Sequence, residues 1–234
     1  MNKNNIFRSN NATLPSRQIY FTRDEILKVK EFAEKIKNKH GHFADKDNHK
    51  ERTPEEVYES VIMGKLAEIA LYKYLRAKHY GTTYEISDLD FKIYGKGICD
   101  SYDLRFNNYN ISIKSSKPYA SCLLIETAKY QLNDEGEVIA IDGHSDNIPD
   151  YYAFVKVKID TKRMQNSYAS ICGAISHKSF WENKREIPRG TRISKDNAKA
   201  YFLDKVELDK LDKNKGTKLL ASNYGIHIDT LKAI

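Results

Sequence analysis

A short stretch in which apolar and polar residues alternate on both sides of a turn constrains the fold most. The turn is predicted at Asn107-Asn108. Because successive side chains of a strand point to opposite faces, residues 101–117 predict a β-hairpin with one face toward a core. The apolar positions are Leu104, Phe106, Ile111 and Ile113. The other face would carry Asp103, Ser112 and Lys114.

These polar side chains are suited to work on a phosphate group. A carboxylate such as Asp103 can hold a divalent cation, and a lysine such as Lys114 can position or polarise an attacking water. Asp100, three residues before Asp103, is a further carboxylate for the metal or for a supporting contact. A serine hydroxyl is a weaker ligand for a hard cation than a carboxylate is, so Ser112 is expected to contribute a hydrogen bond.

A helix is predicted upstream, over 53–78. Thr53-Pro-Glu-Glu56 is a strong helix start, with threonine as N-cap, proline at the first helical position and glutamate three residues after the cap. The apolar stripe that follows has spacings of three and four; it consists of Val57, Val61, Gly64, Glu68, Leu71, Tyr72 and Leu75. A buried carboxylate needs a cation, a metal or a proton. Glu68 is therefore either a metal ligand or the partner of a lysine such as Lys65 or Lys73.

The helix and hairpin together resemble the catalytic core of the PD-(D/E)xK nuclease superfamily, which includes most type II restriction endonucleases. The family pattern is an acid, a short hairpin, then Asp or Glu, any residue, and Lys. Here Asp103 is followed after eight residues by Ser112-Ile113-Lys114, with serine where the family usually has a second acid. Gly64-Lys-Leu-Ala-Glu68 is similar to the helix that precedes the catalytic hairpin in many members. The resemblance covers 54–182 and continues through Leu123-Leu-Ile125, Pro149-Asp-Tyr-Tyr-Ala-Phe-Val155 and Ile171-Cys-Gly-Ala-Ile175.

The resemblance implies an α/β (α+β) fold with a restriction-endonuclease-like core, in which helices flank a central mixed β-sheet. It also implies a Mg²⁺ ion held by Asp103 and Glu68, with the Ile113 backbone carbonyl as a third ligand and Asp100 as an alternative one. One metal ion is favoured over two because the carboxylates are few. The catalytic residues that it implies are Glu68, Asp103, Ser112 and Lys114.

The implied activity is hydrolysis of phosphodiester bonds in double-stranded DNA by a type II restriction endonuclease. A repair or recombination nuclease is an alternative, and so is a DNA-binding protein that kept the fold and lost the chemistry, for which Ser112 is the main argument. A two-fold homodimer would place two sites on opposite strands of a palindromic target. The helix predicted over 21–39 offers a dimer element, because it has no assigned role in the catalytic core.

The charge balance agrees with a polyanionic partner. Lys and Arg outnumber Asp and Glu by 39 to 32, for a net charge of +7, and the isoelectric point is about 9.0. The most basic run, 184–199, is predicted to be a loop that either contacts DNA or is simply solvated. The residues expected to contact DNA are Lys117, Arg185, Arg189, Arg192 and Lys195.

Cysteine and hydropathy patterns predict a cytoplasmic protein. Cys99, Cys122 and Cys172 lack CxxC spacing, which favours buried free thiols in a reducing compartment over a zinc or redox site. The sequence contains no run of ~18 apolar residues, so no membrane span is predicted. The polar N-terminus predicts no signal peptide. The histidines of the polar segment 40–52 favour a solvated or DNA-contacting loop over a metal site; they are His40, His42 and His49.

The chain is predicted to form one domain in three parts. These are an N-terminal arm and helix (1–53), the catalytic core (54–182), and a basic loop with terminal strands and helices (183–234), of which 1–20 would be the arm itself. A short helix capped by Ser176 is also expected. Strands are predicted near 89–94, 102–107, 109–115, 120–126, 151–159 and 168–175, with a long loop or lobe over 127–150.

Overall fold

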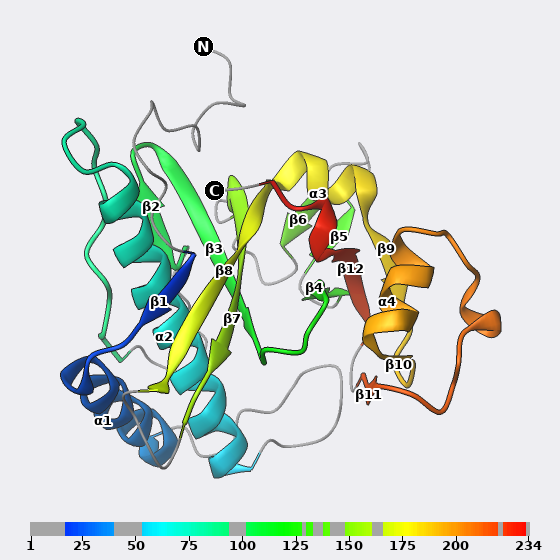
Figure 1. The fold of residues 1–234 in the computed structure, drawn as a ribbon, viewed down its shortest axis with the longest axis horizontal. Helices are drawn as coiled ribbons and strands as arrows, with labels where there is room; N and C mark the ends of the chain where they lie inside the picture. The colour runs from blue at the N-terminus through cyan, green and yellow to red at the C-terminus, as the bar shows by residue number, and fades with distance from the viewer. Residues whose placement is uncertain are drawn as a thin grey trace.

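The computed structural model describes residues 17–39, 53–93, 102–127, 130–132, 138–140, 148–160, 166–219 and 222–232. Its main element is a mixed five-stranded sheet in the order β1-β8-β7-β3-β2 (Figure 1). The strands are β1 (Gln18–Tyr20), β8 (Tyr168–Ser176), β7 (Tyr151–Lys158), β3 (Tyr109–Ser116) and β2 (Leu104–Phe106). β3 and β7 pair in parallel, and the other neighbours pair antiparallel. The predicted α/β (α+β) class with a central mixed sheet is therefore confirmed.

One face of this sheet is covered by two helices, α1 (Arg23–Lys39) and α2 (Pro54–Lys78). The predicted start of α2 is confirmed, because the Glu56 N–H donates to Thr53 Oγ1 at 3.2 Å and the Thr53 N–H donates back to the Glu56 carboxylate at 2.8 Å. The side chains of α2 pack against the inward positions of β2, β3 and β7 in one apolar core. Its central members are Leu66, Ala70, Leu71, Leu104, Ile111, Ala153 and Val155.

The opposite face of the five-stranded sheet packs against a second, antiparallel sheet. This sheet has the order β4-β12-β9, from β4 (Cys122–Glu126), β12 (Asn223–His227) and β9 (Arg185–Ile187). A second core lies between the two sheets and α3 (His177–Asn183), which Ser176 caps as predicted. A third core lies between the second sheet and α4 (Lys195–Phe202). The layers are therefore α1 and α2, the first sheet, the second sheet with α3, and α4.

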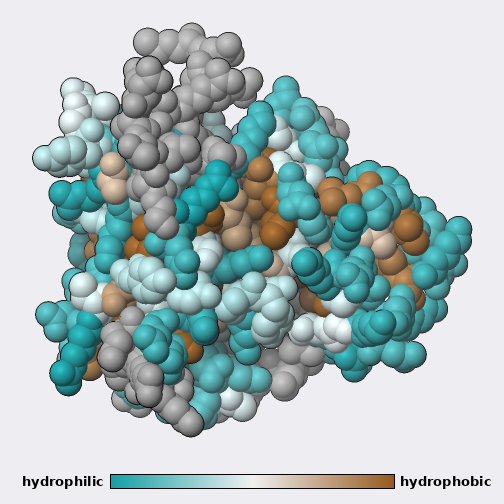
Figure 2. Space-filling model, viewed as in Figure 1, coloured by the Kyte–Doolittle hydropathy of each residue, from teal (hydrophilic) through white to brown (hydrophobic). Residues whose placement is uncertain are grey.

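The remaining elements are short. They are the β5–β6 hairpin (Tyr130–Leu132 and Val138–Ala140), the β10–β11 pair (Arg192–Ile193 and Thr217–Lys218), and the 3₁₀ turns η5 (Leu208–Lys210) and η6 (Ile228–Thr230). On the face drawn in Figure 2 the surface is mainly hydrophilic, and hydrophobic residues show mostly over the region between β8 and α4. Among the described residues no helix is long and apolar enough to cross a membrane.

Three predictions about secondary structure are wrong. Residues 89–93 form no strand, and position 94 lies outside the described residues. The segment 18–20, predicted to belong to an arm, forms the edge strand β1 beside β8. The basic run 184–199 is not a loop, because it contains β9, β10 and the first turns of α4. In each case the deciding contact is a partner strand or core far away in the sequence.

The helix α1 buries the apolar face that its sequence predicts. Its apolar face packs in the same core as α2, with Ile26, Val29 and Ala33 almost fully buried. The reason given for regarding this helix as a dimer element, that it has no role in the core, is therefore wrong.

Candidate functional site

The predicted hairpin brings three polar residues to one edge of the first sheet. β2 and β3 pair antiparallel, and Asn107 makes the turn with a positive φ of 51°. Leu104 and Ile111 are buried toward α2. Because side chains alternate along a strand, Ser112 and Lys114 point to the face opposite α2, as the sequence predicted.

Asp103 is bonded to the strand that carries the lysine. Its Oδ2 accepts a hydrogen bond from the Ile113 backbone N–H at 2.5 Å and another from Ser112 Oγ at 3.3 Å. The second carboxylate oxygen, Oδ1, has no hydrogen-bond partner among the described residues. The carboxylate is thus held in place by one oxygen, and the other oxygen is available to a cation.

The Ile113 carbonyl points to the same edge of β3 as Asp103. The N–H and C=O of one strand residue are directed to the same side, and the Ile113 N–H is directed at Asp103. β2 begins only at Leu104, so β3 runs on past the end of its neighbour on this side. A role for this carbonyl as a metal ligand beside Asp103 stays a prediction.

Lys114 follows two residues after Ser112 on the same face of β3, opposite Phe154 of β7. Its side chain is half-buried. Asp103, directly before β2, thus contacts Ser112 of β3, and Lys114 lies two residues further along β3. Asp100 and the histidine-bearing segment 40–52 lie outside the described residues.

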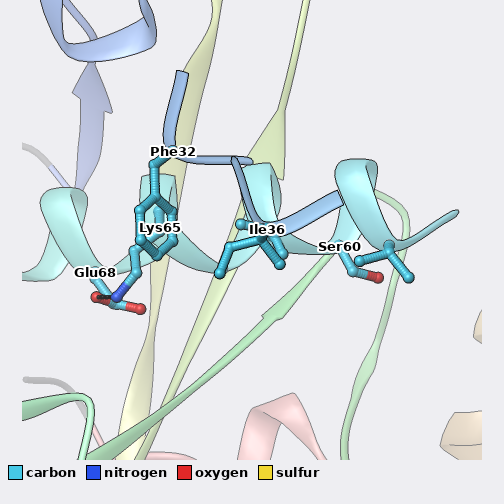
Figure 3. A pocket seen from close by; sticks show the side chains of 8 residues that line it. Phe32, Ile36, Ser60, Lys65 and Glu68 are labelled. Atoms are coloured by element: carbon cyan, nitrogen blue, oxygen red, sulfur yellow. Dashed lines mark hydrogen bonds and ion pairs between the residues drawn. The ribbon is translucent and has the colours of Figure 1, made fainter. Parts of the chain in front are cut away.

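Glu68 is buried, as predicted, but it belongs to the helical layer. The residue is 7 % exposed, and its carboxylate accepts a hydrogen bond from Lys65 Nζ at 2.8 Å (Figure 3). The same ammonium lies 5.4 Å and 5.8 Å from the ring centroids of Phe32 and Phe91. The lysine partner left open by the sequence is therefore Lys65, whereas Lys73 pairs with Glu25. A role for Glu68 as a metal ligand stays a prediction.

No group of three or more His, Cys, Asp or Glu side chains is gathered for a metal within the described part of the chain. The site at the hairpin therefore offers one carboxylate and a backbone carbonyl from this part of the molecule. That donor set suits a hard cation such as Mg²⁺, which takes oxygen ligands and keeps several waters.

The predicted DNA-contacting arginines differ in their surroundings. Arg185 is partly buried; it donates to the Tyr201 carbonyl at 2.5 Å and stacks 3.8 Å from the Tyr201 ring centroid. Arg192 donates to the Gly216 carbonyl at 2.9 Å. Both guanidinium groups therefore join C-terminal segments. Arg192 is nevertheless exposed, as are Arg189, Lys117 and Lys195.

Lys117 and Lys195 line one cleft of about 510 Å³, although they are far apart in the sequence. Lys117 follows directly after β3, and Lys195 is the first residue of α4. The sequence predicted a DNA contact for each lysine, but the residue pattern did not predict that both line the same cleft. It also missed Tyr119, which lines the same cleft and is 68 % exposed.

Of the two described cysteines, Cys122 is buried as predicted, whereas Cys172 is only partly buried. Cys122 and Cys172 are free. Burial raises the pKa of Cys122 to about 12, so its thiol is protonated at neutral pH. Cys99 lies outside the described residues.

A pair formed by a buried tyrosine and a half-buried histidine lies beside the hairpin, and sequence reasoning did not find it. Tyr152 is opposite Ser112 in the parallel register, and its hydroxyl lies 3.0 Å from His177 Nδ1. Burial lowers the pKa of His177 from 6.5 to about 4, and the charge of Asp150 opposes that shift. His177 is therefore neutral in the folded protein at neutral pH.

This pKa predicts acid sensitivity. Between pH 6.5 and about 4 the unfolded histidine binds a proton that the folded one does not. Stability from this source is complete above pH 6.5 and falls as the pH drops toward 4. The free energy of unfolding of His177→Asn, measured by urea titration at several pH values, should depend less steeply on pH in this window than that of the unaltered protein. Equal slopes would show that other groups, such as His227, dominate.

Comparisons of the chain with protein-family models, curated proteins and solved structures found no match.

Proposed function

We propose that this protein is a Mg²⁺-dependent endonuclease that hydrolyses phosphodiester bonds in double-stranded DNA, as type II restriction endonucleases do. The observation that carries the proposal is the bonding of Asp103 to Ser112 and Ile113, with Lys114 two residues further along the same face. The order of helix, hairpin and lysine follows the nuclease pattern, and the net charge of +7 favours a polyanion.

The residues at the hairpin would share the chemistry. Asp103 Oδ1 and the Ile113 carbonyl would hold the Mg²⁺ ion, and Glu68 would join them if its carboxylate is released from Lys65. When bound, the ion polarises a phosphate oxygen and increases the acidity of water. Lys114 would orient the attacking water or neutralise charge on the phosphate. Water adds to phosphorus, the bond to the leaving sugar oxygen breaks, and that oxygen takes up a proton.

Ser112 has a different role from the acid that the family usually has there. Its hydroxyl donates a hydrogen bond to Asp103 Oδ2. This contact orients the Asp103 carboxylate and adds no negative charge. A single metal ion suits a site in which serine replaces the second acid.

Cleavage of supercoiled plasmid with and without Mg²⁺ tests the proposal. The expected result is linear or nicked DNA only when the metal is present. A protein that shifts DNA in a gel and cuts nothing with Mg²⁺ or Mn²⁺ would be a binding protein of the same fold. That second candidate is favoured by Ser112 at the acid position and by the Lys65–Glu68 pair, which occupies the other carboxylate proposed for the metal.

The proposed restriction activity predicts a homodimer on DNA, because one described catalytic constellation per chain can cut one strand at a time. Light scattering with a duplex should give a protein mass of about twice 27.1 kDa. A mass of one chain with and without DNA, together with products that are mainly nicked, would instead favour a nicking or repair-type nuclease.

A further inference from the structure

The cleft that contains Lys117 and Lys195 lies at the end of the strand that carries the candidate site. One wall is the end of β3 and the turn after it, from Ser115 to Tyr119. The opposite wall is formed by β10, β11 and the start of α4. Ser116 is two residues beyond Lys114, which is roughly 7 Å along a strand. A polymer bound across Lys114 would therefore reach this cleft.

A close backbone contact builds the wall opposite β3. Gly216 has a φ of +100°, and a Cβ at this position would lie 2.3 Å from backbone atoms of Ile193 and Ser194. β11 can therefore lie directly against the start of α4, which places Thr217 beside Ser194. Ser194 caps the helix by accepting a hydrogen bond from the Asn197 N–H at 3.1 Å. The positive end of the helix dipole thus lies at the cleft.

The polar groups of the cleft are suited to an anion. Among the described residues, its lining contains two lysines and no Asp or Glu. Neither Lys117 nor Lys195 forms an ion pair within the described residues. Ser121 also lines the cleft, and no hydrogen bond of its hydroxyl to the described residues is seen. This hydroxyl is therefore a further donor for an anion in the cleft.

The rest of the lining is apolar and suited to a flat ring. The apolar side chains are those of Met63, Leu124, Ile193 and Leu219. Tyr119 adds an aromatic residue that is 68 % exposed and lines the same cleft as the two lysines. Cations beside an exposed aromatic ring are the combination that binds unpaired nucleotides, because the ring stacks on a base and the cations contact phosphate. The volume of about 510 Å³ lies in the range of pockets for small organic ligands.

We propose that this cleft holds one unpaired nucleotide of the nucleic-acid strand next to the cleaved phosphate. The phosphate would lie between Lys117 and Lys195 at the start of α4, and the base would lie on Tyr119 and the apolar floor. The proposal rests on the proposed nuclease function, because β3 connects the cleft with the hairpin site. In a duplex, this nucleotide would be turned out of the stack.

Binding of a short fluorescent single strand in EDTA tests the cleft without any cleavage. Tyr119→Ala should weaken binding about tenfold through the lost stacking. The double variant Lys117→Ala/Lys195→Ala should reduce the salt dependence of log K by roughly 0.7, because both lysines contact the same phosphate and each neutralised phosphate of a single strand contributes about that amount. The matched controls are Tyr80→Ala, which removes a tyrosine 89 % exposed outside the cleft, and Lys35→Ala on the exposed side of α1.

An oligonucleotide with one abasic site separates base from phosphate. The loss caused by Tyr119→Ala should shrink when the abasic position occupies the cleft, as seen by moving that position along the strand. Unchanged affinity in both cleft variants overturns the proposal, and so does a Tyr119→Ala effect of equal size on every abasic strand. Plasmid cleavage by the unaltered protein is measured separately. If the unaltered protein cuts DNA and the cleft variants bind single strands as tightly as it does, the cleft proposal alone is refuted. If binding depends on the cleft but the unaltered protein does not cut, the nuclease proposal alone is refuted.

Discussion

Replacing Asp103 with asparagine, or Lys114 with methionine, should abolish Mg²⁺-dependent DNA cleavage while the protein stays folded and bound to DNA. Asparagine keeps an oxygen that can accept the Ile113 N–H but removes the charge that would hold the metal. Loss of the lysine removes a group that orients water or stabilises charge, and such groups contribute about 10²–10⁴-fold to a rate. Binding should persist because it rests mainly on phosphate contacts elsewhere.

The measurement is the single-turnover rate of plasmid cleavage, with DNA affinity determined in parallel. Asp88→Asn and Lys92→Met are matched controls, since both side chains are exposed outside the hairpin. Cutting at the unaltered rate by Asp103→Asn would refute the hairpin site, and Asp100, outside the described residues, would be the next carboxylate to test.

The parts of the fold that sequence predicted are those whose signals are local. The capping box at Thr53 and the alternation around Asn107 each involve neighbouring residues, and both elements form as expected. The hairpin also sets which side chains share a face, so Asp103, Ser112 and Lys114 could be grouped without a structure.

Pairing between distant segments could not be predicted in this way. β4 was expected as a strand, but its partner is β12 near the C-terminus, and together with β9 they form a sheet of their own. Alternation tells that a segment is a strand and not which strand it joins. The same limit hid the cleft, because Lys117 and Lys195 become neighbours only when β11 packs on the start of α4.

Glu68 shows the limit for a single side chain. Its place in the apolar stripe predicted burial correctly. Lys65 lies three residues earlier, and residues at that spacing are neighbours on a helix. A carboxylate at such a position can pair with the lysine or bind a metal. The residue pattern is the same in both cases, so the sequence does not distinguish them.

Glu68→Ala is therefore expected to destabilise the fold by about 3–5 kcal/mol, because it leaves the ammonium of Lys65 without its partner in a largely buried place. The two side chains are 9 % and 15 % exposed, respectively. Replacing both together, as Lys65→Met/Glu68→Met, should cost much less, because a buried ion pair can often be exchanged for apolar residues with little loss. Urea unfolding of the two single variants and the double variant measures these differences.

The double variant also separates the two roles of Glu68. If the carboxylate serves only the ion pair, the Lys65→Met/Glu68→Met protein folds and cuts DNA at close to the unaltered rate. If Glu68 also holds the metal, this folded protein loses cleavage, and higher Mg²⁺ concentrations restore part of it because the remaining ligands bind the ion more weakly. Lys65→Met alone is the control: it frees the carboxylate, so a ligand role predicts that its cleavage survives while that of the double variant does not. Stability of Glu68→Ala equal to that of the unaltered protein would instead show that the buried pair contributes nothing to the fold.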